Sequence, residues 1–236
     1  MSLKGKVAVL AGGEGPLGRE VSKKFLAEGA KVVIGWYSQQ EWEEAKGLIS
    51  ASKGQFAEVR VDATKEEQVQ NLMRVAKDTF GSVDILLHMV GMVHIGPMVW
   101  ETDAAILDRL IDTNLKSAFL CAKHAIKIML EKKSGRIVFF PARVAAEPQP
   151  RFGAYAVSKA GLITLMQVLR EELKDTRITV NAVMPSVMDT FRTRHMPNPD
   201  PDKWVKPSEI ADLLSCLCSD EGGALSGAIL KAFGKL

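Results

Sequence analysis

VAVLAGGEGPLGR, residues 7–19, is the stretch that decides the fold, because it joins an apolar run of strand length to a glycine-rich loop and the start of a helix. Gly13, Gly15 and Gly18 match the spacing G-x-G-x-x-G, and Gly12 precedes them. In this context glycine lets the backbone approach a pyrophosphate closely, and the N–H groups at the start of the helix face the anion. The stretch therefore predicts a dinucleotide site. A tight glycine turn without a ligand is the alternative.

The rest of the chain alternates short β-branched runs with longer helical patterns. We predict strands at 7–11, 32–34, 56–61, 85–88, 136–140, 179–184 and 228–232, and helices at 17–28, 40–51, 65–80, 104–131, 152–174 and 207–218. This alternation implies right-handed crossovers and a doubly wound Rossmann fold, an α/β architecture with a seven-stranded, mostly parallel sheet and helices on both faces. We expect one domain over residues 1–236, with a short substrate loop at about 186–206 that has no helical or strand periodicity.

Two predicted helices carry recognisable start signals. Thr64 and Glu67 have the spacing of a capping box, and Pro207 stands at a first helical position. The long helix at 104–131 has an apolar stripe that includes Phe119 and Met129. The stripe indicates core packing, and a partner helix across a subunit interface is the alternative.

Composition excludes several classes of function. The 236 residues carry a net charge of +3, and the basic residues are scattered rather than gathered, which gives no case for nucleic acid. A polar start without a signal peptide, no apolar run of membrane length, and only three cysteines predict a cytoplasmic protein that neither enters a membrane nor depends on disulfides. Cys216 and Cys218 lie among leucines, which favours a core helix over a metal site.

The end of the second predicted strand bears on which dinucleotide binds. An acid there would bond the ribose 2′-hydroxyl of NAD(H), but no acid appears before Glu41. Arg19 and Ser38 are candidates to bind a 2′-phosphate, and Trp36 is a candidate contact for the adenine. The sequence therefore favours NADP(H) over NAD(H).

Tyr155 and Lys159 lie four residues apart on a predicted helix, so both side chains share one face. A nearby ammonium favours the phenolate form of a tyrosine, so the pair is predicted to relay a proton to or from a substrate oxygen. On its own the spacing is common on helices. Downstream of a dinucleotide loop, it indicates an oxidoreductase.

With these motifs in order along its whole length, the chain resembles the short-chain dehydrogenase/reductase family. The resemblance implies that Asp62 holds the adenine, that Asn114 supports a proton relay through Lys159, and that Thr190 contacts the nicotinamide amide. The predicted catalytic residues are then Tyr155, Lys159 and Asn114. The predicted cofactor site comprises Gly12, Gly13, Gly15, Leu17, Gly18, Trp36, Ser38, Asp62, Ala63, Gly91, Tyr155, Lys159, Pro185 and Thr190.

Departures from the family pattern cluster around the chemistry. The family's catalytic serine corresponds to Ala142, and losing such a hydrogen-bond donor costs on the order of 10²–10³ in rate. The Asn-Ala-Gly motif after the fourth strand is replaced by Met89-Val90-Gly91, and Ser186 stands where the family has glycine. Arg143 and His94 join Ala142 as candidate substrate contacts, with a solvated arginine and a packed histidine as the alternatives.

Two hypotheses follow from this sequence. The first is an NAD(P)-dependent oxidoreductase that interconverts a carbonyl and a hydroxyl group on a small molecule, with Tyr155 as acid or base. The second is a dinucleotide-binding sensor or oligomer partner with little turnover, which Ala142 and Met89 favour. The resemblance implies a homodimer or homotetramer. No Ser-His-Asp order, P-loop or zinc motif favours a hydrolase, a kinase or a metalloenzyme.

Overall fold

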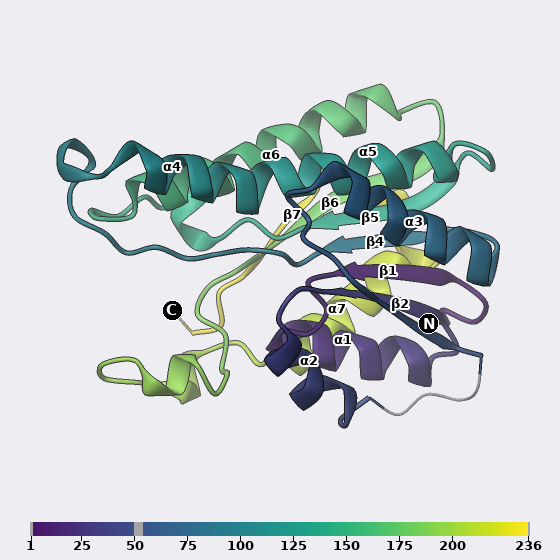
Figure 1. Ribbon diagram of the computed structural model, residues 1–236, viewed down its shortest axis with the longest axis horizontal. Coiled ribbons are helices and arrows are strands. Elements are labelled where there is room, and N and C mark those ends of the chain that lie inside the picture. The colour runs from purple at the N-terminus through teal and green to yellow at the C-terminus, as the bar shows by residue number, and fades with distance from the viewer. Residues whose placement is uncertain (1, 50–53, 236) are drawn as a thin grey trace.

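A computed structural model describes residues 2–49 and 54–235 of the chain. At its centre lies a parallel sheet with the strand order β3-β2-β1-β4-β5-β6-β7 (Figure 1). The strands are β1 (Val7–Ala11), β2 (Lys31–Trp36), β3 (Phe56–Arg60), β4 (Ile85–His88), β5 (Ser134–Phe139), β6 (Arg177–Pro185) and β7 (Ile229–Ala232). The predicted seven-stranded, doubly wound sheet is confirmed, and each pairing within the described residues is parallel.

Burial explains why the central strands are continuous apolar runs. Every residue of β1 and β4 is buried, since helices cover both faces of the sheet there. The edge strand β7 instead alternates between exposed and half-buried residues. A central strand is therefore apolar along most of its length, whereas the exposure of an edge strand alternates along its length.

Two helical layers enclose the sheet. The helices are α1 (Pro16–Ala27), α2 (Gln39–Lys46), α3 (Glu66–Phe80), α4 (Ala104–Leu110), α5 (Ser117–Met129), α6 (Gly153–Glu172) and α7 (Pro207–Cys218). One layer holds α3 to α6, and the other holds α1, α2 and α7 (Figure 1). Each layer has its own buried apolar cluster against the sheet. Leu214, Leu217 and Cys218 of α7 are buried, which confirms the core-helix interpretation of this segment.

Several predicted helices begin or end at other residues in the structure. The helix predicted at 40–51 ends at Lys46, and residues 50 and 51 lie outside the described residues. The capping box of Thr64 and Glu67 is wrong, because Lys65 is the N-cap of α3 and makes no side-chain cap bond. The hydroxyl of Thr64 instead donates to Asp62 Oδ1 at 2.7 Å, which stabilises the turn before the helix.

The helix predicted at 104–131 is interrupted by a π-helical segment, Ile111–Lys116, between α4 and α5. Such segments often mark functional sites, and this one contains the buried Asn114. Met129 lies in the core, as predicted, but Phe119 is 54% exposed. The apolar stripe therefore belongs only in part to the core.

Strand order places the functional edge. The chain leaves β1 towards β2 and β3 and then returns to β4 on the other side of β1, so the loops after β1 and β4 diverge. In open α/β sheets, ligands bind in the crevice at this switch point, outside the carboxyl ends of the strands. The segment predicted as a substrate loop follows β6 at the same edge, and an isolated bridge between Met188 and Val205 closes its two ends on each other.

Candidate functional site

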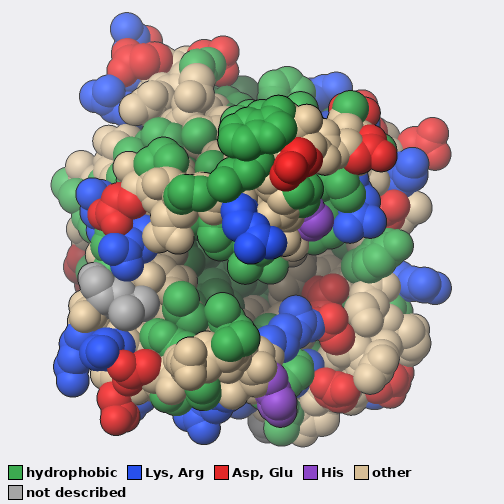
Figure 2. Space-filling view, turned by 90° about the vertical axis from the view of Figure 1, so that its left-hand side faces the viewer, with side chains coloured by type: hydrophobic (Ala, Val, Ile, Leu, Met, Phe, Trp, Pro, Cys, Tyr) green, Lys and Arg blue, Asp and Glu red, His purple; other side chains and the backbone are tan. Residues whose placement is uncertain are grey.

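A cavity of about 1010 Å³ opens at the carboxyl edge of the sheet. Figure 2 views this edge face on and shows a hollow near its centre, with hydrophobic side chains above and below it. Loops after β1 to β6 all contribute to its wall. Of the predicted cofactor and catalytic residues, the cavity is lined by Gly12, Gly15, Leu17, Gly18, Ser38, Asp62, Ala63, Gly91, Tyr155, Lys159 and Pro185.

At two positions of the glycine loop, a side chain would collide with backbone atoms. Gly12 has a φ of +80°, and a Cβ there would lie 2.8 Å from the backbone nitrogen of Val90. A Cβ on Gly18 would lie 2.5 Å from the Cα atom of Gly13, which explains the close approach of α1 to the loop. Gly15 differs, because its Cβ would meet only the Gly12 carbonyl oxygen at 3.7 Å and would face open space. Its lack of a side chain therefore leaves the cavity wall free for a ligand.

Three predicted cofactor residues lie outside the cavity wall. Gly13 faces the core, since a Cβ there would meet Ile34 at 2.9 Å. The predicted contact between Trp36 and the adenine is wrong, because the Trp36 ring is buried and stacked on Trp42 with centroids 5.8 Å apart. Thr190 is buried in the loop after β6, where its hydroxyl and that of Thr193 are 3.0 Å apart.

The two candidate ligands for a 2′-phosphate already have partners. Arg19 donates to the carbonyl oxygens of Glu14 and Glu41 and forms an ion pair with Glu44 at 3.3 Å. Ser38 lines the cavity, but its side chain is the N-cap of α2 and accepts from the backbone N–H of Glu41. Arg19 would therefore have to leave its partners to bind a phosphate, whereas the Ser38 hydroxyl is shown only as an acceptor within the described residues.

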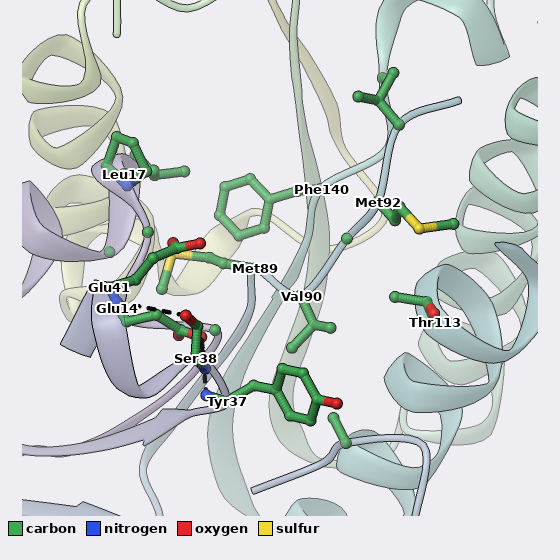
Figure 3. Close-up of a pocket in the computed structure, with 18 of the residues that line it drawn as sticks. Glu14, Leu17, Tyr37, Ser38, Glu41, Met89, Val90, Met92, Thr113 and Phe140 are labelled. Atoms are coloured by element: carbon green, nitrogen blue, oxygen red, sulfur yellow. Dashed lines mark hydrogen bonds between the residues drawn. The ribbon is translucent and has the colours of Figure 1, made fainter. Parts of the chain in front are cut away.

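An acid of the glycine loop occupies the end of β2, which the sequence argument missed. Glu14 lines the cavity and is buried, at 8% exposure. Its Oε1 atom accepts from the backbone N–H groups of Tyr37 at 2.8 Å and of Ser38 at 3.5 Å (Figure 3). The sequence contained a sign of this role. A glutamate inside a loop that binds phosphate would repel the phosphate, unless its side chain points away to another partner.

Tyr155 and Lys159 project from the first turns of α6 into the cavity. The Lys159 ammonium donates to the carbonyl oxygen of Phe140 at 3.0 Å. Burial raises the pKa of Tyr155 to about 12 and lowers the pKa of Lys159 to about 8. Loss of solvent therefore opposes the effect that the sequence predicted for the ammonium, and the pKa of the tyrosine lies above its ordinary value.

Asn114 lies behind the wall and organises it. Its side-chain oxygen accepts from the backbone N–H of Met92 at 2.7 Å, and its amide donates to the Met92 carbonyl and to the hydroxyl of Ser158. A Cβ on Gly91 would lie 3.0 Å from Lys159 Nζ and 3.4 Å from Asn114 Oδ1. The absent side chain of Gly91 is therefore what lets the asparagine and the lysine pack against the same point.

The substrate candidates separate in the structure. Ala142 lines the cavity together with Tyr155. The predicted substrate contact of Arg143 is wrong, because Arg143 lies outside the cavity wall. It forms an ion pair with Glu147 at 2.6 Å and lies over the ring of Phe233. His94 also lies outside the wall and packs on Gly96, where a Cβ would approach its ring to 2.6 Å.

Apolar side chains that the sequence argument did not select form much of the remaining wall. Met89, Val90, Met92 and Phe140 surround the centre of the cavity in Figure 3. They follow β4 and β5, and at Met89 the family resemblance implies an asparagine. Arg192 of the loop after β6 also lines the cavity and forms an ion pair with Glu41 across it.

No helix in the described ranges 2–49 and 54–235 combines the length and apolar character that crossing a membrane requires. Residues 6–200 match the family model for short chain dehydrogenase. A short-chain type dehydrogenase/reductase of Picea abies is 31% identical, with 98% of this chain and 92% of that protein covered. An uncharacterized oxidoreductase of Thermotoga maritima is 30% identical, with 99% and 98% covered.

Solved structures agree with these sequence matches. A short chain dehydrogenase from Bacillus anthracis is 28% identical and superposes with a TM-score of 0.88, covering 99% of this chain and 98% of that one. A short-chain type dehydrogenase/reductase from Mycobacterium ulcerans superposes with a TM-score of 0.91 at 22% identity, covering 100% and 90%. The second likeness concerns the fold alone.

Proposed function

Because this chain belongs to the short-chain dehydrogenase/reductase family, we propose that it is an NAD(P)-dependent oxidoreductase that interconverts a carbonyl and a hydroxyl group. The observation that carries the proposal is that the phenol of Tyr155 and the ammonium of Lys159 share one cavity with the glycine loop. A dinucleotide loop alone would support binding. A buried proton donor in the same cavity supports chemistry.

The cavity fits a dinucleotide on three counts. Gly15 leaves open space at the amino end of α1, where free backbone N–H groups favour a pyrophosphate. Asp62 and Ala63 line the wall after β3, at the end where the adenosine would lie. Tyr155, Lys159 and Pro185 line the part of the wall that would receive the nicotinamide.

Tyr155 is the residue that would move a proton. With a pKa of about 12, its hydroxyl stays protonated at neutral pH and can donate to a carbonyl oxygen as that oxygen gains negative charge. The nicotinamide supplies the hydride in this direction. Lys159 lies one helical turn away, where its charge would stabilise the phenolate that remains. These side chains therefore favour carbonyl reduction at neutral pH.

The cavity wall also bears on the substrate. Apolar side chains surround its centre, so a largely apolar ketone, aldehyde or alcohol fits better than an acidic one. Arg143, which would have favoured an acid, is paired with Glu147. A cytoplasmic location and a homodimer or homotetramer stay predictions from sequence and family.

Ala142 supports a second candidate, a dinucleotide-binding protein with little turnover. The methyl group lies in the cavity wall with Tyr155, so the substrate oxygen receives one hydrogen-bond donor fewer at this position. A deficit of that size, about 3–4 kcal/mol, leaves a slow reaction rather than none. The two candidates therefore differ in rate and not in ligand.

Titration with NADH and NADPH, followed by a panel of apolar ketones and aldehydes, tests the proposal. We expect binding and slow cofactor oxidation, and we expect Tyr155→Phe to reduce that oxidation by at least about 10²-fold while weakening binding much less. Binding without turnover across the panel would favour the second candidate. Failure of both nucleotides to bind would contradict both candidates.

A further inference from the structure

We propose that Glu14, supplied by the glycine loop rather than by the second strand, makes this site selective for NAD(H) over NADP(H). The inference rests on the proposed function, because it concerns the ribose end of the same dinucleotide site. It reverses the preference for NADP(H) that the sequence favoured.

The Glu14 carboxylate lies where the adenosine ribose of a bound dinucleotide would lie. The ribose of a Rossmann dinucleotide lies at the end of the second strand, where an acid usually accepts from its 2′-hydroxyl. β2 ends at Trp36, and the next residues are Tyr37 and Ser38, neither of which is an acid. The Glu14 carboxylate reaches the same place through space, held by the backbone N–H groups of these two residues (Figure 3).

One oxygen of this carboxylate has no hydrogen-bond donor among the described residues. Glu14 Oε2 is buried and has no hydrogen-bond partner among residues 2–49 and 54–235. A buried carboxylate oxygen without a donor is costly, and Glu14, the residue that carries it, lines the cavity. A ribose hydroxyl is a donor of the right kind, so NAD(H) would satisfy the oxygen.

The Glu14 carboxylate would disfavour the 2′-phosphate of NADP(H). Backbone N–H groups after β2 are the donors that such a phosphate would need, and the Glu14 carboxylate already accepts from two of them. The phosphate would also place its negative charge beside a buried carboxylate, where repulsion is weakly screened. The glutamate thus occupies the phosphate position with an anion of its own.

The neighbouring charges agree with this assignment. Glu41 and Asp62 also line this end of the cavity, and both are acids. Arg192, which also lines the wall, forms an ion pair with Glu41. Arg19 is held by Glu44 and by two carbonyl oxygens. Either of these two arginines would have to leave its partner to bind a 2′-phosphate.

Calorimetric titration of the whole protein with NADH and with NADPH tests the inference. We expect NADH to bind more tightly by about 30-fold or more, the scale of a like-charge contact that is partly shielded from water. NADPH binding as tightly as NADH, or more tightly, would overturn the inference and leave the proposed function intact. If neither nucleotide binds, the proposed function fails and the inference with it.

Glu14→Gln separates the charge from the shape. The amide keeps an oxygen for the Tyr37 N–H but carries no charge, so we expect the preference for NADH to fall by about tenfold, mainly because NADPH binds more tightly. Glu43→Gln is the matched control, since it removes the same charge from the exposed face of α2, where Glu43 pairs with Lys46. An equal change of the NADH to NADPH ratio in both variants would overturn the assignment. So would an unchanged ratio in Glu14→Gln.

Discussion

His88 offers a test of how strongly the interior behind the site excludes charge. The residue ends β4 and is fully buried, with Nε2 2.8 Å from the hydroxyl of Ser117. Its other ring nitrogen, Nδ1, has no hydrogen-bond partner in the described part of the chain. Burial, reinforced by the charge of Lys159, lowers the pKa of His88 from 6.5 to about 3. The imidazole is therefore neutral at the pH of a cell.

The lowered pKa sets the sign of the pH dependence. Between about pH 6.5 and about pH 3 the unfolded chain binds a proton at His88 and the folded chain does not, so the free energy of unfolding falls as the pH falls. From about pH 7 to about pH 4.5 the loss from this one residue is roughly 2–3 kcal/mol. His88→Gln keeps an amide nitrogen near the Ser117 hydroxyl but cannot titrate.

Urea unfolding at the two pH values measures this loss. We expect His88→Gln to lose about 2–3 kcal/mol less than the wild-type protein between them, although packing defects lower its stability at both. His195→Gln is the control, because it makes the same substitution at an exposed histidine in the loop after β6. An identical loss in the wild type and in His88→Gln would refute the argument that burial holds this imidazole neutral.

Ala142→Ser returns a hydroxyl to the cavity wall beside Tyr155, and we expect it to raise any reductase rate at least about tenfold in a steady-state assay. No increase would show that another group already bonds the substrate oxygen. Gly18→Ala forces a Cβ to within 2.5 Å of the Gly13 Cα atom, so urea unfolding is expected to show a loss of about 2 kcal/mol or more. Gly15→Ala adds the same methyl group where there is space, so stability should change little while calorimetry shows weaker NADH binding. Equal stability of the two glycine variants would contradict the packing argument.

Much of the fold was predictable because its signals are local. β1, β4 and α7 begin and end at the predicted residues, and Gly12 after β1 and Pro207 at the start of α7 mark two of these boundaries. The break at Ile111–Lys116 was not predictable, because no proline or glycine marks it. Its π-helical turns place Asn114 against Met92 and Ser158, which are distant in sequence.

In the candidate site too, some features were predictable from the sequence and others were not. The glycine loop and the pair of Tyr155 and Lys159 were recognisable from spacing, because each is set by one turn of helix or loop. The partners of Arg19 and Arg143 were not, since an arginine beside a site has the same sequence signature whether it faces a ligand or a carboxylate. The raised pKa of Tyr155 also depends on enclosure by residues from several loops.

The amino-acid sequence by itself determined the doubly wound sheet, the dinucleotide loop and the absence of a serine at position 142. These features follow from periodicity, from residues with special backbone freedom, and from the identity of single side chains. Only the tertiary structure decided that Glu14 takes the place of an acid at the end of β2, and that Trp36 and Arg143 turn away from the cavity. The direction and partner of a side chain depend on segments that the fold brings together from far along the chain, and no local pattern contains that information.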